Sequence, residues 1–95
     1  MKFKKIVWAP SAENDLREAY EYIRQDSQTR AVGFVEDVLA RVEKLVRFEK
    51  LGRMIPEIGY FRYREIIVGE YRIFHEVREK EIFVFRVLHS KRFMV

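Results

Sequence analysis

Residues 63–77 read YREIIVGEYRIFHEV, and this stretch decides the fold. Gly69 and Glu70 stand between two runs that are rich in β-branched and aromatic residues. This arrangement is typical of a two-residue hairpin loop with glycine in its first position. The loop predicts that Val68 lies opposite Tyr71 in an antiparallel strand pair, and that Gly69 has a positive φ angle.

A second turn follows at residues 79–80 and extends the sheet. Regular alternation beyond this turn places Val77 opposite Ile82 and Arg72 opposite Val87. Facing residues share a face of the sheet, so one face is predicted to be apolar and to cover helices. Its members are Ile66, Val68, Tyr71, Ile73, Val77, Ile82, Val84 and Leu88. The other face mixes aromatic and ionisable side chains: Tyr63, Glu65, Ile67, Arg72, Phe74, Glu76, Phe83, Phe85, Val87 and His89.

Two helical patterns precede this sheet. Apolar residues recur at helical spacing over residues 11–26, with Ser11 as the N-cap, and again over residues 29–47. A stretch rich in β-forming residues, 2–8, comes before both. Together the elements predict a single domain over residues 1–95 of the α+β class. We expect a small, mostly antiparallel sheet of about four strands packed on a two-helix hairpin, in the order β-α-α-β-β-β.

Composition narrows the function classes. The 95-residue chain is 48% hydrophobic and 36% charged, which excludes a disordered segment. It has no cysteine and two histidines, so a disulfide framework, a cysteine-ligated zinc site and a thiol nucleophile are excluded, and we expect no metal and no cofactor. No apolar run reaches the roughly 18 residues that span a bilayer, so we expect a cytoplasmic protein without a membrane partner.

The net charge of +4 is unevenly distributed. Residues 51–95 hold nine basic and six acidic residues, and seven of the nine are arginines. The planar guanidinium fork suits phosphate better than an ammonium group does. This excess favours a polyanionic partner, although arginines on strands also pair commonly with glutamates.

Arg72 and His89 are the candidate chemical pair. If Arg72 lies opposite Val87, then His89 is its diagonal neighbour, with backbones roughly 7–8 Å apart. An arginine that holds a phosphoryl oxygen and a histidine that moves a proton could support metal-independent RNA cleavage. The alternative is an Arg72 that forms a salt bridge with Glu65 or Glu76, and a His89 with no chemical role. His75 falls on the apolar face opposite Arg64, where we expect a hydrogen-bonded structural role.

Several segments resemble the RelE/ParE superfamily of bacterial and archaeal toxins of type II toxin-antitoxin (plasmid stabilisation) systems. The matching segments are residues 52–59 (GRMIPEIG), 69–74 (GEYRIF) and 85–92 (FRVLHSKR). The resemblance covers essentially the whole chain. It implies a strand, two helices and three antiparallel strands, as the residue patterns do. It also implies a growth-inhibiting toxin held inactive by a cognate antitoxin protein.

The superfamily contains two mechanisms. RelE-like and YoeB-like members are endoribonucleases that enter the ribosome and cut mRNA without a metal. Resemblance to them implies catalytic roles for Arg72, on phosphate, for His89, as general acid, and for Glu57, as base. The alternative for Glu57 is a solvated loop residue without a catalytic role. Ser90 follows His89 where these relatives end in His-Tyr, and no tyrosine occurs after Tyr71. The favoured interpretation is ribosome-associated mRNA cleavage.

ParE-like members poison DNA gyrase without such chemistry, and residues 52–57 and 86–92 resemble them at least as well. The gyrase interpretation would use protein contacts through the helical hairpin and residues 91–93. A third alternative is a noncatalytic nucleic-acid-binding module.

Candidate binding residues follow from the charge. Arg53, Arg62 and Arg92 are candidates for contacts with RNA or DNA phosphates, and ordinary surface charge is the alternative interpretation. We expect the antitoxin to supply an acidic amphipathic segment that covers this basic face, with three aromatic anchors. The anchors expected are Phe74, Phe83 and Phe85.

Overall fold

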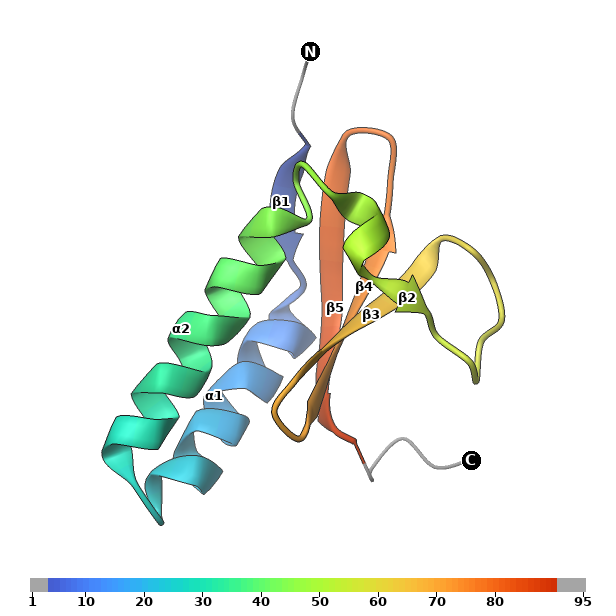
Figure 1. Ribbon diagram of the computed structural model, residues 1–95. Helices are drawn as coiled ribbons and strands as arrows, with labels where there is room; N and C mark the ends of the chain where they lie inside the picture. The colour runs from blue at the N-terminus through green and yellow to red at the C-terminus, as the bar shows by residue number, and fades with distance from the viewer. Residues whose placement is uncertain (1–3, 91–95) are drawn as a thin grey trace.

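The computed structural model describes residues 4–90, and they form a five-stranded mixed sheet with two helices. The strand order across the sheet is β1-β5-β4-β3-β2 (Figure 1). The strands are β1 Lys5–Trp8, β2 Arg53–Met54, β3 Tyr63–Val68, β4 Tyr71–Val77 and β5 Glu81–His89. β1 runs parallel to β5, and the other neighbouring strands are antiparallel.

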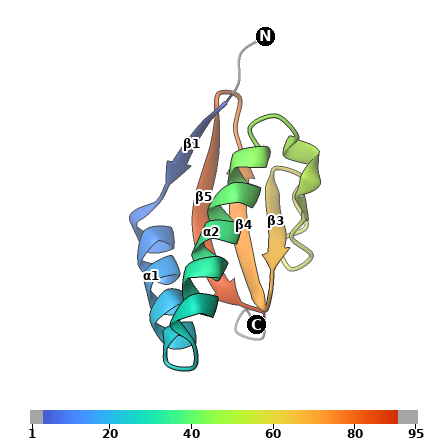
Figure 2. The ribbon, with the colours of Figure 1, turned by 60° about the vertical axis from the view of Figure 1, so that its left-hand side comes forward.

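The two helices form a hairpin on one face of the sheet (Figure 2). They are α1, Pro10–Arg24, and α2, Gln28–Lys44. The predicted N-cap at Ser11 is wrong, because the helix begins one residue earlier at Pro10, whose fixed φ angle suits the first helical position. The Ser11 hydroxyl instead donates to the Phe85 carbonyl at 2.9 Å.

The main hydrophobic core lies between this hairpin and the sheet. Ala9 and Ala12 let the start of α1 approach the sheet closely, and branched aliphatic side chains fill the space between the helices and the sheet. The buried core residues are Ala9, Ala12, Val38, Val42, Leu45, Ile66, Val68, Ile73, Ile82, Val84 and Val87. The predicted α+β class and the helical hairpin are therefore confirmed.

The β3–β4 hairpin has the predicted register. Val68 lies opposite Tyr71, and Gly69 has a φ of 58°, as the turn requires. The two-residue strand β2 was not predicted, because a strand that short shows no alternation in sequence. β2 forms the edge of the sheet beyond β3, away from the two helices (Figure 1). A short 3₁₀ turn, η1, Glu49–Leu51, leads into it.

The β4–β5 pairing contains a β-bulge that the sequence did not reveal. Val77 lies opposite Ile82 as predicted, but His75 pairs with Val84 and Phe74 pairs with Arg86, which leaves Phe85 as the extra residue. The bulge shifts the register of the rest of β5 by one residue.

The predicted pairing of Arg72 with Val87 is consequently wrong, because Arg72 lies opposite Leu88. Val87 joins the core at 3% exposure, and Leu88 takes the face that was predicted for Val87. Both positions are apolar, so their hydropathy could not reveal the shift.

Candidate functional site

Arg72 is the centre of an ion-pair network on the sheet face that the helices leave uncovered. Its Nε donates to Glu65 Oε1 at 2.6 Å. Its two terminal nitrogens donate to the two carboxylate oxygens of Glu57, at 2.9 and 2.7 Å. Arg53 Nε donates to the second oxygen of Glu65 at 2.7 Å. Four alternating charges therefore connect β2, β3, β4 and the turn after β2.

The register explains why these side chains meet. Arg53 lies opposite Glu65, and Glu65 lies opposite Phe74, so all three point to one face together with Arg72, two residues before Phe74. The turn that follows β2 brings Glu57 over the same face. Glu65 is wholly buried, and the Arg72 side chain is only 7% exposed.

The network sets the protonation state of Glu57. Hydrogen bonds from Arg72 lower the pKa of Glu57 to about 2, and the two carboxylates raise the pKa of Arg72. Glu57 is therefore ionised at neutral pH, with an Arg72 donor on each oxygen. A carboxylate with so low a pKa is a weak general base. Glu57 lies 2.7 Å from Arg72, where it holds the guanidinium that was expected to bind phosphate.

His89 lies on the opposite face of the sheet. It pairs with Tyr71, and successive residues on a strand point to opposite faces, so His89 shares the helix side with Tyr71 and not the Arg72 side. Its ring packs edge-on against Tyr71, with centroids 5.3 Å apart, and its Nε2 lies 3.0 Å from Glu70 Oε1. The predicted convergence of Arg72 and His89 on one phosphate is wrong, because the bulge at Phe85 reverses the side on which His89 lies.

His75 lies on the helix face opposite Arg64, as predicted, and is wholly buried. Its Nδ1 lies 3.4 Å from the Ile73 carbonyl, and its Nε2 has no hydrogen-bond partner among the described residues. Gly52 faces the ring so closely that a Cβ there would lie 2.7 Å from Cε1 and Nε2. Burial lowers the pKa of His75 from 6.5 to about 4. The ring is therefore a neutral packing element at neutral pH.

We expect this histidine to make the fold sensitive to acid. Below pH 6.5 an unfolded chain binds a proton at His75 that the folded chain does not bind, so stability falls as the pH drops from 6.5 towards 4. The full loss should be roughly 3 kcal/mol. Urea titrations at pH 7, 5.5 and 4.5 measure it, and the His89→Gln variant, which keeps His75, should show the same loss. A free energy of unfolding that stays constant over this range would contradict the buried neutral ring.

The arginines predicted to bind phosphate differ from one another in their exposure and contacts. The Arg53 side chain is 63% exposed although it is bonded to Glu65. Arg62 lies 3.6 Å from Glu76, and its guanidinium carbon lies 5.6 Å from the centre of the Tyr60 ring. Arg92 lies outside the described residues. Arg53 and Arg62 remain predictions as phosphate contacts, and each already has an acidic partner.

The predicted antitoxin anchors need one correction. Phe74 is only 1% exposed, because it lies between Arg72, 5.0 Å away, and the ring of Phe85, 6.0 Å away. It cannot serve as a surface anchor. Phe83 is covered on one side by the Arg78 guanidinium, 4.0 Å from its ring centre.

Sequence reasoning missed an apolar groove between α1 and α2. Its cavity of about 600 Å³ is lined mainly by apolar side chains. They are Trp8, Leu16, Tyr20, Val32, Val35 and Leu39, with Glu13, Arg17 and Glu36 also in the lining. Helical periodicity favours a core position for the apolar stripe of each helix, whereas Leu39 is 48% exposed. Within residues 4–90 no three acidic or histidine side chains form a metal-binding group, and no helix is long and apolar enough to cross a membrane.

Comparisons with known proteins agree with this architecture. Residues 6–93 match the family described as the ParE toxin of the type II toxin-antitoxin system parDE. No curated protein sequence matches the chain.

Three solved structures resemble it. The chromosomal ParDE system of P. aeruginosa has a TM-score of 0.75 at 21% identity, covering 94% of this chain and 98% of that one. The RelBE2 toxin-antitoxin complex of Mycobacterium tuberculosis has a TM-score of 0.62 at 17% identity, covering 92% and 98%. The RelB-RelE antitoxin-toxin complex of Methanococcus jannaschii has a TM-score of 0.56 at 28% identity, covering 94% and 99%.

Proposed function

Because the chain belongs to the ParE toxin family of type II toxin-antitoxin systems, we propose that it arrests growth by poisoning DNA gyrase through protein contacts, without cutting RNA. The observation that supports this proposal most is the separation of the two candidate catalytic side chains. Arg72 and His89 lie on opposite faces of the sheet, and Arg72 is held by two carboxylates.

Cleavage of mRNA on the ribosome is the competing mechanism. It would require Arg72 to release Glu57 before it could bind a phosphate, and it would require a proton from a residue other than His89 on that face. It would also need a base stronger than the Glu57 carboxylate. Gyrase poisoning needs none of these rearrangements. Both targets are cytoplasmic, so either mechanism implies the same location.

A cognate antitoxin is the second partner in the proposal. Two of the structural relatives are named as toxin-antitoxin complexes, and the groove between α1 and α2 offers a site of suitable shape and chemistry. Amphipathic helices bind such grooves by their apolar face. We therefore propose that the antitoxin binds in this groove, because Phe74 is buried and cannot contact it.

The test is expression without antitoxin in a strain with wild-type gyrase. We expect growth arrest with gyrase-linked DNA breaks and intact mRNA, and we expect His89→Gln to remain toxic because His89 transfers no proton. Co-expression of the antitoxin should abolish the arrest and serves as the control. Cleaved mRNA, together with a loss of roughly 10²–10⁴ in cleavage rate for a folded His89→Gln protein, would establish the nuclease instead.

A further inference from the structure

Exposed apolar side chains are concentrated along the β2 edge of the sheet. Ten large hydrophobic residues are exposed within the described chain, and six of them lie within residues 48–61. They are Phe48, Leu51, Met54, Ile58, Tyr60 and Phe61. Phe61 is the most exposed phenylalanine of the described residues, at 62%. Such a concentration on one edge marks an interaction site more often than scattered single residues do. We call residues 48–62 the β2-edge surface.

Residues 44–62, which are the β2-edge surface and the four residues before it, carry most of the net positive charge. Residues 44–62 contain five basic and two acidic residues, against a net charge of +4 for the whole chain. Both acidic residues already have basic partners, since Glu49 lies 3.3 Å from Lys4 and Glu57 is bonded to Arg72. Arg53 and Arg62 also have acidic partners, Glu65 and Glu76, so the positive border of the apolar residues comes from the excess of basic over acidic residues in 44–62.

A buried residue, backbone hydrogen bonds and an ion pair hold the backbone of the β2-edge surface in place. Ile55 is wholly buried, and its N–H donates to the Tyr63 carbonyl at 3.0 Å, which extends the β2–β3 pairing. The N–H groups of Ile58 and Gly59 donate to the Ile55 carbonyl at 3.1 and 2.9 Å. The Glu57–Arg72 ion pair ties the same turn to β4. The surface is therefore ordered before any partner binds, which lowers the entropy cost of binding.

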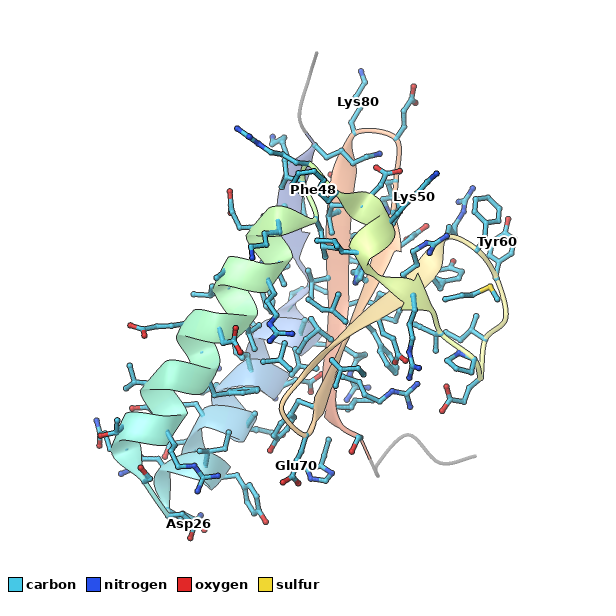
Figure 3. The ribbon with its side chains drawn as sticks, viewed as in Figure 1. Asp26, Phe48, Lys50, Tyr60, Glu70 and Lys80 are labelled. Carbon is cyan, nitrogen blue, oxygen red and sulfur yellow. The ribbon has the colours of Figure 1, made fainter. Side chains whose placement is uncertain are left out.

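The aromatic residues of the turn are arranged as a cluster. The ring centroid of Tyr60 lies 5.2 Å from that of Phe61 and 5.7 Å from that of Tyr63. Arg62 extends over the Tyr60 ring. Figure 3 shows Tyr60 pointing away from the sheet on the side opposite the helices. Tyrosine, arginine and methionine, all present here, are enriched at the centres of protein interfaces.

We propose that the β2-edge surface is where this toxin binds its target, and that the target is a protein surface with an apolar pocket bordered by acidic side chains. The exposed aliphatic residues Leu51, Met54 and Ile58 favour a protein over a nucleic acid, because bases stack on aromatic rings and arginine planes rather than on aliphatic chains. The positive border supplies the charge complementarity. The inference rests on the proposed function only in taking gyrase as the first target to test.

The experiment compares Tyr60→Ser and Phe61→Ser, at positions 46% and 62% exposed, with Tyr22→Ser, at an aromatic position on α1 that is 65% exposed. Titration of purified gyrase should show binding weakened about 30-fold or more for the two edge variants and unchanged for the control. The edge variants should lose growth arrest when expressed alone. Their melting temperatures and their binding to the antitoxin should match the wild type, since both replaced side chains are exposed.

Each alternative outcome is distinct. Edge variants that still arrest growth would overturn the proposal, and loss of antitoxin binding by folded edge variants would assign the surface to the antitoxin. Wild-type binding to single-stranded RNA that is lost in Phe61→Ser would assign it to nucleic acid. If the wild type causes no DNA breaks, gyrase poisoning fails as the function. Loss of arrest by Phe61→Ser but not by Tyr22→Ser would then still support the edge surface, with another protein target.

Discussion

Replacing Arg72 with alanine should lower the free energy of unfolding by about 3–5 kcal/mol, because it removes the partner of two carboxylates. Glu65 is wholly buried and would keep only the bond from Arg53, while Glu57 would lose both of its donors from Arg72. Urea unfolding at pH 7 measures the loss. Arg72→Lys should recover little of it, since one ammonium group cannot reproduce the fork that binds both carboxylates.

Arg78 provides the matched control. It also bonds two glutamates, Glu76 and Glu81, but its side chain is 41% exposed, so Arg78→Ala should cost far less than Arg72→Ala. An Arg72→Ala protein with wild-type stability but no toxicity would contradict the structural role. Removal of an ion pair that stabilises the fold must lower the stability, so unchanged stability would show that Arg72 does not have this role. The loss of toxicity would then make Arg72 a candidate for target binding.

Phe74→Ala should destabilise the protein by about 3–5 kcal/mol, as large-to-small changes at buried aromatic positions do. Phe74 lies on the face without helices, yet it is only 1% exposed. Phe61→Ala, at a position 62% exposed, should change the free energy of unfolding by no more than about 0.5 kcal/mol. Thermal and urea unfolding of the two variants compare the positions directly. If the two variants had equal free energies of unfolding, the sheet face without helices would have no hydrophobic core of its own.

The sequence predicted most of the architecture because local signals determine it. Gly69 fixes the turn and hence the register of β3 with β4, and the helical stripes of α1 and α2 identify the hairpin. The bulge at Phe85 has no such signal. Residues 82–85 and 87–88 are all apolar, so either register satisfies the hydropathy pattern, and only the three-dimensional pairing distinguishes them.

The candidate site was predictable only in part. The motif around Arg72 identified the arginine, and the alternative salt bridge to Glu65 is confirmed. The ion pair between Glu57 and Arg72 was not predicted, because Glu57 lies on an irregular turn without sequence periodicity. The β2-edge surface was not predicted either, because a two-residue strand and the turns beside it show no amphipathic pattern.

The bulge in β5 also has an evolutionary consequence. A relative whose last strand kept its length but lost the bulge would pair Arg72 with Val87, and its terminal histidine would then lie on the Arg72 side of the sheet. Loss of the bulged residue Phe85 itself would leave the histidine opposite Tyr71. No substitution at His89 or Arg72 brings the two side chains to one face. The presence of the bulge in the last strand, rather than the residue type at either position, therefore decides whether these two side chains can meet. Relatives of this chain should be sorted by whether their last strand carries the bulge, and a shared arginine and histidine alone do not imply a shared chemistry.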